Sequence, residues 1–269
     1  MKRLVFLSLL CPLSALAQTG EQYLKAYEST LALNRKAPTM HFFAVKREQI
    51  RQDTMAASGP AYRFRGLDYV RRQEYEQAAY WFEKTANTFP KEHGAIGEFY
   101  MSFLHDYSRA LQHLDAYDAL TPNFDDLINN NRVSYIRGLT YRCLGDHDKA
   151  IEQFSISIDP LEAKHGAEWV NYRHFVSRAV SYIAPRQPEK ALVDLDKAIK
   201  NFNRSALVQY YRGQALLQLN RTAEARTAFQ DASFFYKALR YERTGNYQED
   251  DFNPIVESEI EDALTKLKN

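Results

Sequence analysis

The sequence has few cysteines, almost no net charge and no long apolar run beyond its first residues, and each shortage argues against a class of protein. Only two cysteines occur in 269 residues. Cys11 lies in an N-terminal segment that we interpret as a signal, so Cys143 has no internal disulfide partner. We expect Cys143 to be a small buried hydrophobic residue. The net charge of +1 gives no support for nucleic-acid binding, which requires clustered basic surface.

The N-terminus has the features of a cleavable export signal. Lys2 and Arg3 form a positive region, residues 4–10 are apolar apart from one serine, and residues 15–17 read Ala-Leu-Ala. The apolar stretch is too short to span a bilayer, which requires roughly 20 apolar residues. We therefore predict that residues 1–17 are removed and that the mature protein is periplasmic or secreted.

Two alternatives to soluble export stay open. One is a lipid anchor on Cys11, although Leu10 stands where lipidation requires a small residue. The other is an uncleaved N-terminal anchor. No later segment is long and apolar enough to predict a membrane helix, so no integral membrane segment is expected after cleavage.

Four later segments share one spacing of small and large residues. In each, a small residue is followed by a large apolar residue at +3, an alanine at +12 and a large apolar residue at +16. The sets are Gly66, Tyr69, Ala78 and Phe82; Gly138, Tyr141, Ala150 and Phe154; Ala179, Tyr182, Ala191 and Leu195; and Gly213, Leu216, Ala225 and Phe229. Steps of three and four residues define one helix face, and turn-forming residues interrupt the step of twelve. Each segment is therefore predicted to be two antiparallel helices joined by a tight turn.

The small residue of each set indicates close packing between the two helices. A glycine inside a helix costs about 1 kcal/mol relative to alanine, yet three of the four sets have one at this position. We expect the small residue to meet the alanine of the second helix, while the tyrosine and phenylalanine fill the space beside them.

These residues resemble the tetratricopeptide repeat (TPR), whose motif places a Gly or Ala, a Tyr, an Ala, a Phe and a closing Pro at these intervals. Residues 72–78 and Pro90 fit its turn and exit. A weaker copy lies between the first two sets, where residues 106–110 and Leu114 fit the second helix. Its first helix departs from the motif, because Glu98 stands at the small position, with glycines close by.

The resemblance implies an all-α fold, a right-handed superhelical solenoid of stacked antiparallel helix pairs with a C-terminal capping helix. We predict a helical pair or degenerate repeat at 18–59, about five repeats at 60–239, and a polar linker with a capping helix at 240–269. Asn253-Pro254 is a helix-start signal. An apolar face that includes Ile260 and Ala263 follows it and is expected to cover the last repeat.

Two connections are longer than the family period, at residues 123–132 and 160–169. Each is predicted to lengthen a second helix and its exit loop. Simple loop tolerance explains both insertions. An extra contact surface near Trp169 is the functional alternative.

The sequence offers no pattern typical of catalysis. None of its seven histidines has metal-binding spacing, and no glycine-rich phosphate loop or GxSxG motif occurs. Acidic residues alternate with Lys and Arg, as on solvated helix faces. We therefore predict no catalytic residue, no metal site, no cofactor and no enzyme activity.

In TPR proteins the first helices of successive repeats line a concave groove, and the resemblance implies the same here. The positions three before, one after and four after the small packing residue supply arginines and aromatic residues, which are frequent at interface hot spots. The predicted partner-binding residues are Arg63, Phe99, Arg132, Tyr135, Arg142, Arg173, Tyr210 and Gln214. They favour a peptide or partner helix with acidic character. Arg63 and Leu67 stand where carboxylate-clamp TPRs have Lys and Asn, so that clamp is not expected.

These features favour a non-catalytic scaffold that binds a protein or peptide partner in the groove, outside the cytoplasm. The alternative is a structural protein that assembles into homo-oligomers. Fold alone does not define the partner, whose identity the sequence leaves open.

Overall fold

The computed structural model of the protein describes residues 58–242 and 249–267. The predicted signal (1–17) and nearly all of the predicted N-terminal helical pair (18–59) lie outside the described residues. The chain divides into two compact units, one ending at Phe89 and one beginning at Pro90.

The first unit contains one described helix pair, α3 (Gly59–Arg71) and α4 (Tyr75–Thr88). Ser58 caps α3, since its hydroxyl accepts the amide N–H of Ala61 at 3.3 Å. A Cβ placed on Gly66 would lie 2.3 Å from the ring of Phe82. Glycine is therefore required for this approach of α3 to α4.

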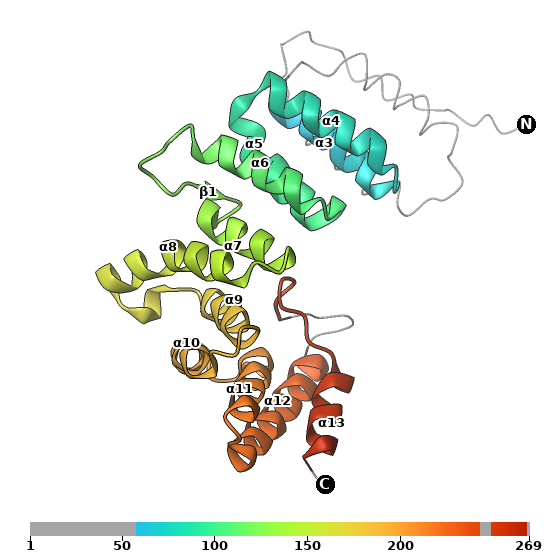
Figure 1. Cartoon of the computed structure of the whole chain (residues 1–269). Helices are drawn as coiled ribbons and strands as arrows, with labels where there is room; N and C mark the ends of the chain where they lie inside the picture. The colour runs from blue at the N-terminus through green and yellow to red at the C-terminus, as the bar shows by residue number, and fades with distance from the viewer. Residues whose placement is uncertain (1–57, 243–248, 268–269) are drawn as a thin grey trace, which may run out of the picture. The chain divides into compact units, whose positions relative to one another are not determined.

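The second unit contains four helix pairs and a final helix within its described part (Figure 1). The pairs are α5 (His93–Phe99), continued by the π-helix η2 (Tyr100–Leu104), with α6 (Tyr107–Asp118); α7 (Val133–Cys143) with α8 (His147–His165); α9 (Tyr172–Ile183) with α10 (Pro188–Asn201); and α11 (Ala206–Gln218) with α12 (Thr222–Glu242). The final helix is α13 (Glu257–Lys266). The connections contain the 3₁₀ helices η1 (Pro90–Glu92) and η3 (Ala167–Trp169) and the strands β1 (Leu127–Ile128) and β2 (Asn131–Arg132).

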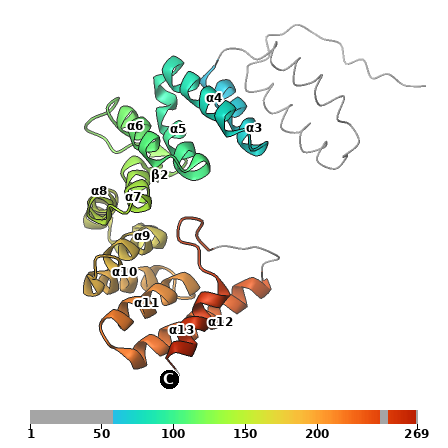
Figure 2. The same ribbon diagram turned by 45° about the vertical axis from the view of Figure 1, so that its right-hand side comes forward.

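Helices of the second unit pack mainly against their neighbours in the chain. In addition, the first helices of successive pairs contact one another, α7 with α9 and α9 with α11. The stacked pairs are visible in Figures 1 and 2. This arrangement confirms the predicted α-solenoid of antiparallel helix pairs.

One residue in the left-handed backbone region closes the turn between the helices of each described pair. Gln73, Gly145, Arg186 and Asn220 have φ angles of 62°, 79°, 58° and 58°. Each lies seven positions after the small packing residue of its pair (66, 138, 179 and 213). The turn in the weaker copy uses His105, with φ 53°. The same backbone conformation thus reverses the chain in every pair.

The weaker copy keeps the repeat geometry by absorbing one extra residue. Its small packing residue is Gly97, where a Cβ would lie 2.7 Å from Leu114, so the predicted alignment on Glu98 was wrong by one position. His105 comes eight positions after Gly97 instead of seven. The π-helix η2, which is wider than an α-helix, takes up the difference.

The groups nearest to the glycines of the four sets are phenylalanine rings of the second helix, closer than the packing alanines. A Cβ on Gly138 would lie 2.6 Å from Phe154, and one on Gly213 would lie 2.7 Å from Phe229. Three predicted packing tyrosines, Tyr69, Tyr141 and Tyr182, are partly buried. The remaining large packing residues and the packing alanines are fully buried: Ala78, Phe82, Ala150, Phe154, Ala179, Ala191, Leu195, Leu216, Ala225 and Phe229.

The two insertions differ from each other. The first forms a hairpin of β1 and β2, and Asn129 and Asn130 at its tip have φ angles of 48° and 69°, as a type I′ turn requires. Since α6 ends at Asp118, the predicted lengthening of the second helix is wrong there. The second insertion does lengthen its helix, because α8 continues through Pro160 to His165. Trp169, which follows it, is exposed.

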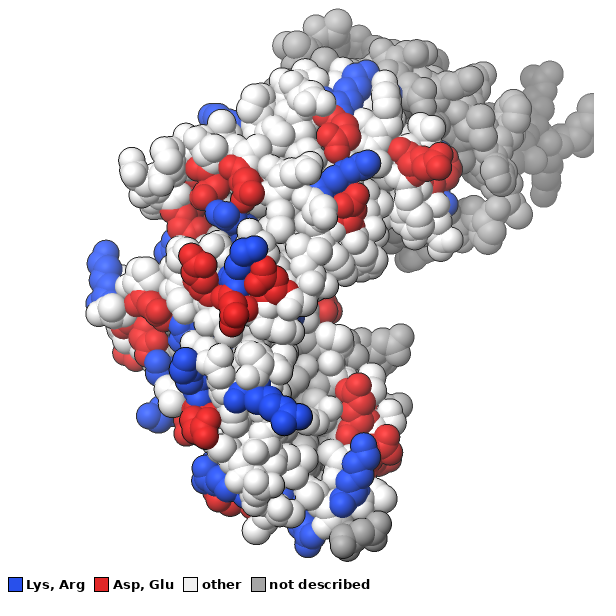
Figure 3. All heavy atoms as spheres, viewed as in Figure 1, with Lys and Arg blue, Asp and Glu red and all other residues white. Residues whose placement is uncertain are grey.

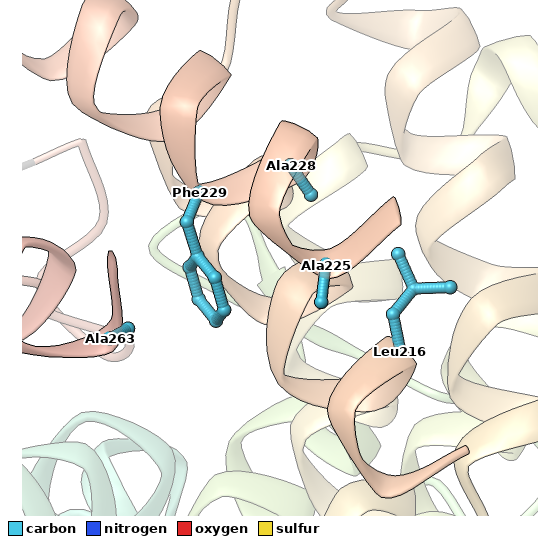
Figure 4. Close-up of a cluster of buried hydrophobic side chains, with 5 residues drawn as sticks. All are labelled: Leu216, Ala225, Ala228, Phe229 and Ala263. Carbon is cyan, nitrogen blue, oxygen red and sulfur yellow. The ribbon is translucent and has the colours of Figure 1, made fainter. Parts of the chain in front are cut away.

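The last helix covers the final pair. Ala263 of α13 faces Phe229, in a buried cluster with Leu216, Ala225 and Ala228 (Figure 4). Because α12 and α13 are in contact, α13 acts as the predicted cap.

Two predictions about local structure fail. The helix α13 begins at Glu257, with Val256 as its N-cap, so Asn253-Pro254 does not start it. Residues 249–256 instead form a non-helical segment, which we call the strap. Cys143, the last residue of α7, is exposed, so its predicted burial is wrong. Within the described ranges, no helix is both long and apolar enough to cross a membrane.

Candidate peptide-binding groove

Three first helices of the second unit, α7, α9 and α11, carry a row of polar and aromatic side chains that hold the strap. Figures 1 and 2 both show the strap beside α9, reaching towards α7 before the chain returns to α13. Glu249, Asp250, Asn253 and Ile255 of the strap are buried, with exposed fractions of 6%, 5%, 2% and 2%. The part of the predicted partner-binding surface that contains Tyr135 and Arg142 is therefore covered by the strap.

The carboxylate of Glu249 occupies a site at the N-terminus of α11. Its Oε1 accepts the hydroxyl hydrogen of Tyr172 at 3.0 Å and that of Ser205, and its Oε2 accepts the amide N–H of Leu207 at 3.2 Å. Ser205 is the N-cap of α11, and its hydroxyl oxygen also accepts the N–H of Val208. A helix N-terminus favours negative charge, so local sequence and helix dipole together create a carboxylate site.

Asn253 fills a second polar site, between α7 and α9. Its Oδ1 accepts from Nη1 of Arg142 at 2.6 Å, and its Nδ2 donates to Oγ of Ser177 at 2.9 Å and to Oδ2 of Asp250 at 2.6 Å. Nη2 of Arg142 also donates to the backbone carbonyl of Phe252 at 2.8 Å. Each polar atom of this buried amide is thus partnered, as burial of a polar side chain requires.

Aromatic rings form the wall beside the second site. Tyr135 is buried, shares a 2.9 Å hydrogen bond with Ser177, and stacks on His174 with ring centroids 3.9 Å apart. Phe252 of the strap meets Tyr135 edge to face at 6.5 Å. Burial raises the pKa of the Tyr135 phenol, and the same effect, with the charge of Arg132, lowers the pKa of His174 to about 4. Both rings are therefore neutral at pH 7.

Strap and groove have complementary charges. The strap begins with three acidic residues, Glu249, Asp250 and Asp251, while the groove contributes Arg142 and the N-terminus of α11. Elsewhere charges are mixed: acidic and basic side chains are interspersed on the face seen in Figure 3. The complementary charges are thus a local feature of the strap and of the groove residues that contact it.

Among the predicted groove residues, only Tyr135 and Arg142 have described contacts to the strap. Tyr210 packs on the capping cluster and accepts a 3.2 Å hydrogen bond from Gln214, so this pair lies at the cap. Arg132 donates to the carbonyl of Asp125, in the inserted loop.

The remaining predicted positions have other neighbours. Arg173 lies beside the ring of Tyr172 at 5.6 Å. Phe99 contacts Phe103 of the π-helix, with ring centroids 5.6 Å apart. Arg63 belongs to the first unit, where its guanidinium lies 5.6 Å from the ring of Phe64.

Sequence analysis missed the residues that complete the site. Tyr172 and Ser205 stand at helix starts, outside the positions counted from the small packing residue. The sequence alone predicts a polar linker at Glu249 and Asp250 and a helix start at Asn253. The sequence does contain one indication of the contact, because the acidic run at residues 249–251 is complementary in charge to Arg142. No spacing rule, however, relates residues that lie so far apart in the sequence.

Other clusters of reactive groups have structural explanations. Arg178 forms a buried pair with Asp194, at 2.7 Å and 2.8 Å, and bonds Asp159, which ties α9 to α10 and α8. The rings of His93 and His113 share a 2.9 Å contact between α5 and α6. In the described part of the chain, no three His, Cys, Asp or Glu side chains are arranged to hold a metal ion. The groove is therefore the best candidate for function.

Solved structures with the same fold are TPR proteins. The crystal structure of MamA matches 70% of this chain and 98% of its own, with TM-score 0.54 and 16% identity. A tetratricopeptide repeat protein from Parabacteroides merdae matches 93% of both chains, with TM-score 0.51 and 17% identity. Cut9–Hcn1 of the APC/C matches 93% of this chain and 42% of its own, with TM-score 0.56 and 16% identity. The chain therefore has the TPR fold, as its repeats predicted.

These identities establish the shared fold alone. No model of a known protein family matches the chain, and no curated protein matches it in sequence.

Proposed function

We propose that the protein is a non-catalytic scaffold that binds a protein or peptide partner in the groove of α7, α9 and α11. One observation carries the proposal: the groove already holds polypeptide in a non-helical conformation. It does so through side chains of Arg142, Tyr172, Ser177 and Ser205, contributed by three successive repeats. A surface that satisfies a buried carboxylate and a buried amide has the chemistry of peptide recognition.

We further infer from the N-terminal signal that this binding takes place outside the cytoplasm, in the periplasm or after secretion. The fold supports an assembly role, since Cut9–Hcn1, a structure of the same fold, is a hetero-tetramer. A stack of helix pairs presents an extended concave surface of this kind.

A cross-linking pull-down from the envelope fraction tests the proposal, with partners identified by mass spectrometry. The strap must first be released, so the bait is full-length protein with Glu249→Ala and Asn253→Ala. We expect it to capture a defined partner more strongly than the wild type. Adding Arg142→Glu to this background should abolish capture, while Lys200→Glu, an exposed charge reversal on α10, should not.

Light scattering on the same proteins separates the alternative. A scaffold keeps its mass when Arg142 is replaced. If its mass fell while capture stayed constant, the groove would serve self-assembly. Absence of any partner from the released variant, in repeated experiments, would refute the scaffold.

A further inference from the structure

We propose that the partner binds as an acidic segment with the pattern Glu-Asp-x-x-Asn, and that the strap is its intramolecular competitor. The inference rests on the proposed function and names the chemistry of the ligand. Two observations support it. The groove has one site for the side chain of Glu249 and another for that of Asn253, and Asp250 forms a turn in the backbone between them.

The first site requires a carboxylate. Three groups donate to Glu249: the hydroxyls of Tyr172 and Ser205 and the N–H of Leu207. A glutamine of the same shape has an NH₂ group in place of one oxygen, and this donor would face a donor of the site. Because the site lies at a helix N-terminus, it also favours the negative charge. Glutamate is thus distinguished from its nearest neutral analogue.

The second site requires a group that both accepts and donates. Arg142 donates to Oδ1 of Asn253, whereas Oγ of Ser177 accepts from its Nδ2. An aspartate here would place an oxygen where the amide donates, beside the carboxylate of Asp250. The site therefore selects a side-chain amide.

Asp250 sets the spacing between the two sites. Its Oδ1 accepts the backbone N–H of Phe252 at 3.0 Å, and its Oδ2 accepts Nδ2 of Asn253 at 2.6 Å. This local turn bends the strap, so that Glu249 and Asn253 reach sites on different helices. A ligand needs an aspartate, or a residue that forms the same turn, directly after its glutamate.

The strap is joined covalently to α12 and α13, so its effective concentration at the groove is high. For a tethered segment such concentrations are on the order of millimolar. A separate segment of equal chemistry therefore binds weakly to the wild type and tightly once the strap is released. The occupant that we assign is a segment of a different protein, because a second copy would only exchange one strap for another.

A peptide with the sequence of residues 249–256, acetylated and fluorescently labelled, tests the inference by anisotropy. The receptor is the full chain with Glu249→Ala and Asn253→Ala. We expect it to bind the peptide at least about tenfold more tightly than the wild type does. Binding should weaken at least about tenfold when the peptide carries Glu249→Gln or Asn253→Asp. A peptide with Asp251→Asn is the matched control, since Asp251 is exposed, and should bind as before.

Three results would overturn the inference. These are equal binding by the released and wild-type proteins, equal binding of a scrambled peptide, and a wild-type dimer that dissociates when Asn253 alone is replaced. If the double variant does not fold, the wild type with excess peptide replaces it. Hydrogen exchange at the Phe252 amide should then quicken, and unchanged exchange would count against competition.

The outcome is distinguishable from failure of the proposed function. A released variant that captures a partner protein but ignores this peptide refutes the pattern and leaves the scaffold intact. A released variant that captures nothing and binds no peptide refutes both.

Discussion

Replacing Arg142 and Asn253, separately and together, measures how firmly the strap is held. Arg142→Ala removes hydrogen bonds of 2.6 Å to Asn253 and 2.8 Å to the carbonyl of Phe252. Hydrogen bonds to a charged group contribute about 1.5–3 kcal/mol each, and Asn253 loses a partner while remaining buried. We expect Arg142→Ala to destabilise strap docking by about 3 kcal/mol. The coupling energy between the two substitutions should be about 1.5 kcal/mol, because the pair shares only one of these bonds.

An exposed ion pair in the same unit provides the control. Lys237 and Glu261 are 3.4 Å apart, with side chains 54% and 56% exposed. Since exposed pairs contribute little, their double-mutant cycle should give about 0.3 kcal/mol. The comparison shows whether burial and geometry, rather than charge alone, give Arg142 its effect.

Hydrogen exchange at the Phe252 amide is the assay, because this N–H donates to Asp250 within the docked strap. A loss of about 3 kcal/mol accelerates its exchange by roughly 100-fold. Urea unfolding of the same variants gives an independent value. A coupling energy below about 0.5 kcal/mol, no larger than that of the surface pair, would refute the view that Arg142 holds the strap.

Three further predictions concern packing, pH and chemical access. Gly138→Ala should destabilise the protein by about 1–2 kcal/mol in thermal unfolding, because overpacking against Phe154 outweighs the gain in helix propensity. Adding Phe154→Leu should restore part of the lost stability, and a Gly138→Ala protein more stable than the wild type would contradict the predicted steric clash. Burial and the charge of Arg132 lower the pKa of His174 to about 4. The neutral form of His174 therefore stabilises the folded state fully above the unfolded pKa of about 6.5, and this stabilisation decreases as the pH falls from about 6.5 towards 4. By pH 4 the loss reaches about 3 kcal/mol, and His174→Phe should flatten this part of the stability curve unless another group causes it. Cys143 is exposed, so iodoacetamide should modify its thiol in the native protein, which peptide mapping can detect. If the thiol reacted only after unfolding, its exposure in the native structure would be contradicted.

The fold was predictable because the spacing of small and large residues that defines each helix pair repeats along the sequence. The spacing from Gly138 to Ala150 and Phe154 reports a local helix pair, and four copies in one phase identify stacked pairs. The weaker copy shows the limit of counting. Glu98 was aligned with the glycines because a fixed spacing cannot detect a π-helix that adds one residue. Only the contact of Gly97 with Leu114 shows the true alignment.

The groove was predictable in part. Tyr135 and Arg142 follow from helix geometry, because they lie three residues before and four residues after Gly138, along one side of α7. The strap does not follow, because a non-helical segment has no period to detect, and its sites depend on the tertiary approach of α7, α9 and α11. Asn253-Pro254 also fits a helix start, and nothing local distinguishes the two interpretations.

The strap changes how the repeat array is connected for folding. In a stack with nearest-neighbour contacts alone, the terminal pairs can open without disturbing those behind them. Here Asn253 forms a hydrogen bond with Arg142, 111 positions earlier in the sequence. The series of contacting helices α7, α9, α11 and α12 is therefore linked back to α7 through the strap. A linear array thereby becomes a closed ring, and opening any of these pairs breaks a contact with another. We expect the repeats within the ring to unfold as one cooperative block.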